Sequence, residues 1–209
     1  MERIGGKGCA LFVRCDVTRD LEALFEKVIE VYGTMDILCN NAGIAGEEII
    51  WEEAGCKRWT KMMEVNLNAV IRGTQLAIQI FKKQGKGGVI VNTASLAGIY
   101  PQTAPTNTVY GVAKAGVVHF SRSLANLYES DKIRVVAICP GFTESPMTEP
   151  IKGIIQDFFK ETIMKADTVI EGFIQLITDK DKRGGGAVMR ITSKTGIDYP
   201  SILNRRSKL

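Results

Sequence analysis

Two residues one helical turn apart carry the clearest chemical signal in the sequence. Tyr110 and Lys114 are four positions apart in a segment with helical patterning, so they share one face of the predicted helix. A phenol with its usual pKa of about 10 is a poor base at neutral pH, and a neighbouring ammonium would stabilise the phenolate and lower that pKa. Ser95, which follows a predicted strand, could hydrogen-bond the same substrate oxygen. Together the three residues indicate proton exchange with an alcohol or carbonyl.

Other distinctive residues also follow the ends of predicted strands. Asn40 to Gly43 follow one strand, and Pro140-Gly141 ends another. In parallel α/β sheets, ligands bind beyond the carboxyl ends of the strands. We therefore expect the loops that begin at Asp16, Asn40, Ala94 and Pro140 to form one site.

The elements that would position these loops alternate regularly along the chain. The predicted strands, apolar throughout, cover residues 9–15, 35–39, 89–93, 134–139 and 187–192. The predicted helices, with apolar residues at helical spacing, cover residues 21–32, 58–83, 109–128, 150–164 and 167–178. Such alternation is typical of α/β proteins with a doubly wound, Rossmann-like parallel sheet. No linker or internal repeat interrupts it, so we expect a single domain over residues 1–209.

Composition and charge exclude several classes of protein. With 45% hydrophobic and 24% charged residues, the chain is neither disordered nor fibrous. Arg205, Arg206 and Lys208 supply three of the four charges in its net charge of +4. The rest of the chain is therefore nearly neutral, and we expect no nucleic-acid partner. No apolar run approaches the roughly 20 residues of a membrane span, and the first residues lack the features of a secretory signal.

The cysteines and the histidine add a prediction about compartment and metals. The five cysteines are odd in number and form no CxxC pair, and four of them lie in apolar, strand-like runs. This favours free, buried thiols in a reducing compartment over disulfides, so we expect a cytoplasmic protein. The single histidine, His119, has no cluster of Cys or carboxylate residues beside it, which favours a packing or surface role and no metal site.

Taken together, the motifs resemble the short-chain dehydrogenase/reductase family over about residues 9–199. The matching motifs, in the family's order, are Asp16-Val17, Asn40-Asn41-Ala42-Gly43, Val65-Asn66-Leu67, Ser95, Tyr110 to Lys114 and Pro140-Gly141. The end segment, Gly186 to Thr192, looks most like the branch of the family that acts on prostaglandins. The resemblance implies hydride transfer between NAD and a secondary alcohol or ketone of a lipid-like substrate, such as a 15-hydroxyprostaglandin. NADP is not excluded, because the residue that chooses between the two has no counterpart here.

The resemblance also implies a role for each matching residue. Tyr110 is the general acid/base, Lys114 lowers its pKa and holds the nicotinamide ribose, Ser95 orients the substrate oxygen, and Asn66 holds a water of the proton relay. The residues expected to contact NAD are Cys15, Asp16, Val17, Asn41, Tyr110, Lys114, Thr143 and Ser145, and those expected to contact substrate are Ser95, Asn107 and Phe142. A homodimer through the helices at 58–83 and 109–128 is implied as well.

The sequence departs from the family pattern at several points. Ser145 stands where the family usually has Thr, and Asn107 where the prostaglandin branch has Gln. The family's glycine-rich phosphate loop has no counterpart, since Gly5-Gly6-Lys7-Gly8 precedes a predicted strand instead of following one. We therefore expect an N-terminally truncated chain that lacks the first two strands. This leaves open an alternative function, a non-catalytic dehydrogenase-like protein unable to hold the cofactor, and the missing loop is the feature that separates the two hypotheses.

Two structural alternatives also stay open. Without the first two strands, the strand at 9–15 and the strand around Ile37 would either pair with each other or keep exposed edges. A second apolar set either lines a lipid pocket or packs as ordinary helix core. Its members are Met147, Ile151, Ile154, Ile155, Phe158, Phe159, Ile163 and Met164.

Overall fold

The computed structural model describes residues 10–46, 49–52, 58–101, 107–157, 162–178 and 184–200. Within them, one five-stranded sheet has the order β1-β2-β3-β4-β5. The strands are β1 (Ile37–Asn40), β2 (Gly88–Thr93), β3 (Ile133–Pro140), β4 (Val188–Thr192) and β5 (Gly196–Asp198). β1 to β4 pair in parallel, and β5 is antiparallel to β4. The predicted α/β fold with a mostly parallel sheet is confirmed, whereas β5 was not predicted.

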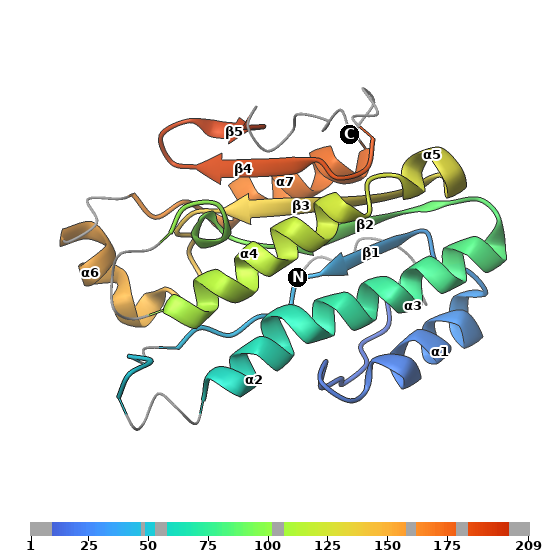
Figure 1. Ribbon diagram of the computed structural model, residues 1–209, viewed down its shortest axis with the longest axis horizontal. Helices are drawn as coiled ribbons and strands as arrows, with labels where there is room; N and C mark the ends of the chain where they lie inside the picture. Colours follow the sequence, from blue (N-terminus) through green and yellow to red (C-terminus); the bar gives the residue numbers. More distant parts are fainter. Residues whose placement is uncertain are drawn as a thin grey trace.

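Helices cover both faces of the sheet (Figure 1). They are α1 (Leu21–Tyr32), α2 (Trp59–Met63), α3 (Ala69–Gln84), α4 (Thr108–Ser123), α5 (Leu127–Asp131), α6 (Lys152–Asp157) and α7 (Ala166–Thr178). α1, α3 and α4 contribute to the core on one face, and α7 packs on β2, β3 and β4 from the other. A π-helical turn, η2 (Glu64–Asn68), joins α2 to α3, and a 3-10 turn, η3 (Leu96–Gly98), follows β2.

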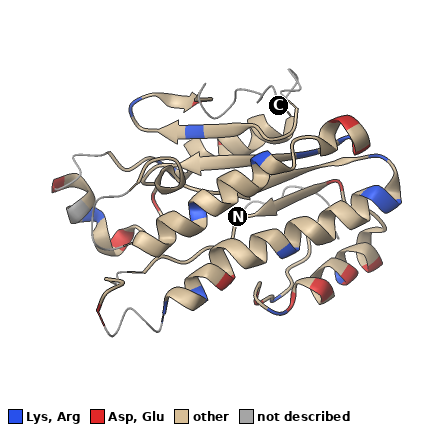
Figure 2. Ribbon diagram, viewed as in Figure 1, with Lys and Arg blue, Asp and Glu red and all other residues tan. Residues whose placement is uncertain are grey.

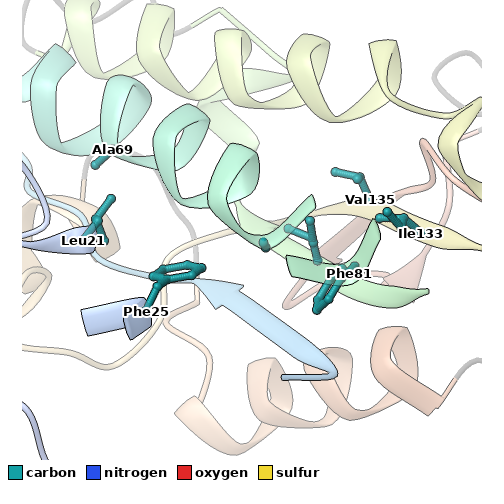
Figure 3. Packing of buried hydrophobic residues seen from close by; sticks show 8 residues of the cluster. Leu21, Phe25, Ala69, Phe81, Ile133 and Val135 are labelled. Atoms are coloured by element: carbon teal, nitrogen blue, oxygen red, sulfur yellow. The ribbon is translucent and has the colours of Figure 1, made fainter. Parts of the chain in front are cut away.

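Apolar clusters on the two faces hold these helices on the sheet. The cluster on the α3 face contains Leu21, Phe25, Ala69, Ala77, Phe81, Ile90, Ile133 and Val135 (Figure 3). Phe81 of α3 is fully buried there and packs against Gly88 of β2. The cluster on the α7 face contains Val91, Val136, Ile138, Met164, Leu176, Ala187, Met189 and Ile191. β3 contributes to both clusters, which explains why its seven residues from Ile133 to Cys139 are all buried.

α1 has the predicted bounds because the sequence supplies its end. Gly33 adopts a φ of 71°, in the left-handed region, and its N–H donates to the Ile29 carbonyl. Asp20 occupies the N-cap position, but its side chain does not cap the helix. Its carboxylate accepts instead from the Asp16 N–H at 2.8 Å, which closes the turn before the helix.

The strand predicted at residues 9–15 is wrong over its described part. Residues 10–16 adopt no regular secondary structure, and the side chain of Phe12 is 90% exposed. A strand needs a neighbour for its backbone N–H and C=O groups, and no described strand lies beside this segment. The chain turns instead, with the N–H groups of Arg19 and Asp20 donating to the Asp16 carbonyl.

β1 is an edge strand and not the buried strand that its sequence predicted. It pairs with β2 on one side, and among the described residues no strand pairs with its other side. Ile37 is 44% exposed and Cys39 is exposed, and α7 packs mainly on β2, β3 and β4. Of the two outcomes expected for this region, the described chain therefore shows the exposed edge.

Three other predictions on helices and thiols need correction. The helix predicted at 109–128 is divided, because α4 ends at Ser123 and a turn precedes α5. The helix predicted at 150–164 ends at Asp157 in the residues described, and Met164 lies in an isolated bridge with Thr143. Of the cysteines, Cys139 is buried, whereas Cys15 is half-buried and Cys39 exposed; all three are free, and Cys9 and Cys56 lie outside the described residues.

A chain of buried polar side chains crosses the sheet on the α3 face. The Asn40 amide donates to Asn92 Oδ1 at 2.9 Å and to the Thr74 hydroxyl at 3.1 Å. Asn92, fully buried in β2, in turn donates to the Ser121 hydroxyl of α4 at 3.0 Å. The hydrogen bonds connect β1, β2, α3 and α4 and fix their positions below the carboxyl ends of the strands.

The surface agrees with an ordinary globular protein. In the view of Figure 2, Lys and Arg are spread over several elements, and acidic residues colour α1. His119 is exposed on α4, which favours the surface role over packing. Over the part of the chain that the structure describes, no helix has the length and apolar character to cross a membrane, and no three potential metal ligands gather.

Candidate active site

The residues predicted to do chemistry meet where β2 and β3 end. Ser95 follows β2 with an extended backbone, and its hydroxyl accepts from the Ala97 N–H at 3.2 Å, which starts η3. Tyr110 and Lys114 lie on the first turns of α4, and α4 packs against η3. The Ser95 and Tyr110 side chains hydrogen-bond each other. Three of the four predicted catalytic side chains are therefore adjacent.

Lys114 is an unusual buried cation beside this pair. It is 3% exposed, its Nζ donates to the Thr93 carbonyl at 2.7 Å, and it lies 5.8 Å from the centre of the Tyr110 ring. Burial lowers the pKa of Lys114 from 10.5 to about 8, with the Cys139 thiol opposing the shift. At neutral pH the amine is thus still mainly an ammonium.

The pKa of Tyr110 does not move in the predicted direction. Burial raises the pKa of this phenol above its ordinary value, and the hydrogen bond from Ser95 lowers it by less. Lys114 does not lower the pKa of Tyr110 as predicted, because its ammonium faces the ring and the Thr93 carbonyl instead of donating to the phenol oxygen. At neutral pH, Tyr110 is accordingly a neutral phenol that can donate a proton.

Because the Lys114 amine is buried, we expect the free energy of unfolding to depend on pH. Between pH 8 and 10.5 the unfolded chain binds a proton at Lys114 that the folded chain releases, so the unfolding free energy rises with pH. Burial raises the pKa of Cys139 from 9.0 to about 12, which has the opposite effect above pH 9. The rise is therefore confined to about pH 8 to 9 and reaches at most about 1.4 kcal/mol per pH unit. Urea unfolding at pH 7, 8 and 9 should show it.

The matched variants for this measurement are Lys114→Met and Lys83→Met. Lys114→Met keeps most of the length of the side chain and removes the titrating group, so the rise in its unfolding free energy between pH 8 and 9 should disappear. Lys83 is exposed on α3, and its replacement should leave the wild-type slope. If the unfolding free energy of Lys114→Met still rises between pH 8 and 9, another titrating group causes the rise.

Asn66 lies in the π-helical turn and holds the loop that follows β1. Its side-chain oxygen accepts from the Ile44 N–H at 2.9 Å, and its amide donates to the Ile44 carbonyl at 2.8 Å. A Cβ on Gly43 would lie 3.3 Å from Asn66 Oδ1 and 3.7 Å from Lys114 Nζ, so the loop backbone passes close to both. The role predicted for Asn66, holding a water, stays a prediction.

The residues predicted to contact the adenine half of NAD form a separate local cluster. The Asp16 carboxylate accepts from the Thr18 N–H at 3.0 Å and from its hydroxyl at 2.8 Å, and these bonds lower the pKa of Asp16. Cys15 and Val17 pack against the α3 cluster. Asn41 lies apart from this cluster, on the side of Lys114. Its side-chain oxygen accepts from the Thr93 hydroxyl, and the Thr93 carbonyl accepts from Lys114.

The loop after β3 carries the other predicted cofactor contacts. The Thr143 hydroxyl donates to the Gly141 carbonyl at 3.0 Å, and the hydroxyls of Ser145 and Thr148 are 3.2 Å apart. The Phe142 carbonyl accepts from the Met164 N–H. The loop is thus closed on itself by its own hydroxyls, with residue 164 paired alongside.

Asn107 occupies the position before α4 in an uncommon conformation. Its φ is 67°, in the left-handed region, and its side-chain oxygen is buried without a hydrogen-bond partner. It lines a small cavity together with Gly46, Ile50, Trp59, Met62, Thr108 and Val109. A buried acceptor without a partner fits a hydrogen-bond donor such as a hydroxyl.

The apolar set at 147–164 does not behave as one surface. Ile155 is fully buried, and Met164 belongs to the α7 cluster, whereas Met147 is 39% exposed. Phe158 and Phe159 lie outside the described residues. The described members thus favour packing over a common pocket.

Sequence reasoning missed two groups that support the site. The Thr93 carbonyl holds the Lys114 amine, and the Cys139 sulfur lies against the backbone of Ser95. Both residues lie at the ends of predicted apolar strands, and this position could have indicated that they support the site. Their side chains alone suggested no chemistry.

Comparison with known families identifies the family of the chain. The family model described as short chain dehydrogenase matches residues 1–153. The chain belongs to the short-chain dehydrogenase family. Its members are typically NAD(P)-dependent oxidoreductases, so the chain is an oxidoreductase of this kind.

Individual short-chain dehydrogenases resemble the chain over most of its length. The NAD-dependent 15-hydroxyprostaglandin dehydrogenase of Homo sapiens is 37% identical, covering 90% of this chain and 73% of that enzyme. The same enzyme of Mus musculus is 36% identical, covering 90% and 72%. The 3beta-hydroxysteroid dehydrogenase 2 of Eggerthella lenta is 38% identical, covering 64% of this chain and 51% of that protein.

A solved structure supports the fold independently. A short-chain type dehydrogenase/reductase from Mycobacterium marinum matches with a TM-score of 0.80, over 87% of this chain and 74% of that chain. At 23% sequence identity, this likeness concerns the fold alone.

Proposed function

We propose that the chain transfers hydride between NAD and a secondary alcohol or ketone of a lipid-like substrate, with a 15-hydroxyprostaglandin as the leading candidate. The observation that carries the proposal is the cluster of Ser95, Tyr110 and buried Lys114 at the carboxyl ends of β2 and β3. The relatives of 36% and 37% identity that act on 15-hydroxyprostaglandin with NAD support the choice of substrate and cofactor. We place the activity in the single domain formed by residues 1–209.

The residues around Lys114 fit the nicotinamide and ribose part of such a cofactor. Gly43 brings backbone, without a side chain, to the buried amine and to Asn66. Lys114 would hold the ribose, and Asn41 would line the groove beside it. Thr143 and Ser145 would meet the carboxamide, while Cys15, Asp16 and Val17 would contact the adenine. When bound, the nicotinamide supplies the hydride acceptor or donor.

The chain's own residues handle the proton. In alcohol oxidation, Tyr110 Oη, as the phenolate, takes the hydroxyl proton while the hydride leaves the carbon that bears the hydroxyl, and Ser95 Oγ holds the substrate oxygen. In carbonyl reduction the proton moves from Tyr110 to the oxygen. The raised pKa of Tyr110 keeps the phenol protonated, which suits it to donate the proton in carbonyl reduction, whereas oxidation first requires its ionisation. Asn66 would hold the water that passes the proton onward.

Asn107 would accept a hydrogen bond from a substrate hydroxyl through its buried side-chain oxygen, which has no hydrogen-bond partner. The cavity beside it has a volume of about 10 Å³, so it takes a group no larger than a water molecule. Phe142 would close the other side of the substrate.

NADH absorbance with three alcohols tests the proposal. We expect NAD reduction with a 15-hydroxyprostaglandin and little with a 3β-hydroxysteroid or 2-propanol, and less with NADP than with NAD. Turnover of the steroid alone would replace the proposed substrate. No reduction with any alcohol would favour the non-catalytic alternative.

We also propose a homodimer through α3 and α4, in the cytoplasm. Val112 of α4 is 57% exposed and Ile71 of α3 is 38% exposed, and α3 contacts α4. Val112→Glu should bury a charge in this interface and shift the protein to monomer in light scattering at tens of micromolar. Ile170→Glu, at an exposed position of α7, is the control and should stay dimeric. A monomeric wild type would contradict the proposal.

A further inference from the structure

The loop that carries Ser95 runs from β2 to Tyr100 over the ends of the strands. It starts with the Ala94 N–H donating to the Ile138 carbonyl of β3 at 2.8 Å. The N–H groups of Ile99 and Tyr100 then both donate to the Leu96 carbonyl, which closes η3 into one compact turn. The position of the Ser95 hydroxyl therefore depends on what holds this turn from its two sides.

On one side, the turn is held by close contact with α4. A Cβ on Gly98 would come within 2.5 Å of the Lys114 carbonyl, and one on Gly111 would lie 3.4 Å from the Ala97 carbonyl. The two backbones thus touch, next to Tyr110 and Lys114. This contact fixes the distance between the turn and α4 but leaves the far side of the turn to another support.

On the other side, the support comes from β4. Arg190 Nη1 donates to the Tyr100 hydroxyl at 2.6 Å, across 90 positions of sequence. The rest of the guanidinium is engaged by Asp198 of β5, with Nε donating to Oδ1 at 2.8 Å and Nη2 donating to Oδ2. Arg190 is also the register partner of Cys139, whose sulfur lies against the Ser95 backbone. The hairpin of β4 and β5 therefore places Arg190 against Tyr100, at the end of the turn that carries Ser95.

We propose that Arg190, oriented by Asp198, is a positioning residue that holds the Ser95 turn through Tyr100 and so keeps the Ser95 hydroxyl on Tyr110. Because Asp198 already fixes the Arg190 guanidinium, Arg190 loses little rotamer freedom when it binds the Tyr100 phenol, and it can therefore hold the turn in place. The kinetic part of the proposal rests on the proposed function, since it requires turnover. The structural part does not.

Hydrogen exchange of the amides of residues 97–100 tests the structural part in the full chain. Tyr100→Phe removes the phenol oxygen but leaves the pair of Arg190 and Asp198 intact, so the fold is preserved. We expect these amides to exchange about tenfold faster in Tyr100→Phe and in Arg190→Met, and Arg190→Lys to restore part of the protection. Tyr32→Phe, at an exposed tyrosine of α1, is the control and should match wild type. Exchange within twofold of wild type in Tyr100→Phe would overturn the proposal.

Kinetics tests whether the support also positions Ser95. With an active wild type, Tyr100→Phe should lower kcat about fivefold and change the KM for NAD less than twofold, because the cofactor contacts are elsewhere. Faster exchange with an unchanged kcat would overturn the positioning role. A wild type without turnover would sink the proposed function and leave the exchange result to decide the structural claim.

Discussion

Tyr110→Phe is expected to lower kcat for secondary-alcohol oxidation about a thousandfold. The phenylalanine ring fills the same space on α4, but it has no oxygen to take the substrate proton or to bond Ser95. A positioned acid or base contributes about 10² to 10⁴ to the rate, and this variant removes it completely. NADH absorbance under saturating NAD and substrate measures the loss.

The control for this variant separates chemistry from folding. Tyr128→Phe, on α5, should keep wild-type turnover. The unfolding free energy of Tyr110→Phe in urea should lie within about 1 kcal/mol of wild type, since the buried ring is retained. Wild-type kcat in Tyr110→Phe would refute the role of Tyr110, and the assignment of the site would then have to be given up.

Asn92→Ala is expected to destabilise the fold by about 3 kcal/mol. Asn92 is fully buried and bonds Asn40 and Ser121 at once, so its truncation leaves buried partners without a bond and opens a cavity in β2. Urea unfolding at neutral pH measures the change. Asn126→Ala, at an exposed turn position, should change the unfolding free energy by less than about 0.5 kcal/mol. Equal effects of the two substitutions would mean that the polar chain does not stabilise the sheet.

Elements that are determined locally were predictable from the sequence. α1 has a continuous apolar face and a glycine at its end, and its predicted bounds are confirmed. β3 is apolar throughout because it is covered on both faces, and its predicted and observed limits differ by one residue at each end. The proximity of Ser95 to Tyr110 was predictable from strand ends and helical spacing together with the family resemblance.

Features that depend on distant neighbours were not predictable in this way. Residues 10–16 are apolar enough for a strand, but no described strand pairs with them. β5 has three residues and depends on pairing with β4, so its own sequence carries almost no signal. The raised pKa of Tyr110 results from burial by the folded chain, and the bond between Arg190 and Tyr100 joins residues 90 positions apart. None of these follows from spacing within a segment.

The open edge of β1 has a consequence for how solvent reaches the site. Among the described residues β1 is held by one ladder, whereas β3 is held by two, so we expect β1 to separate from the sheet at a lower free-energy cost. The same strand leads directly into the loop of Asn41 and Gly43, whose backbone covers the Lys114 amine. We therefore expect an opening of β1 to shift this loop as well and to let water reach the amine. The edge strand β1 and the hydration of the buried cation are thus expected to be coupled through this loop.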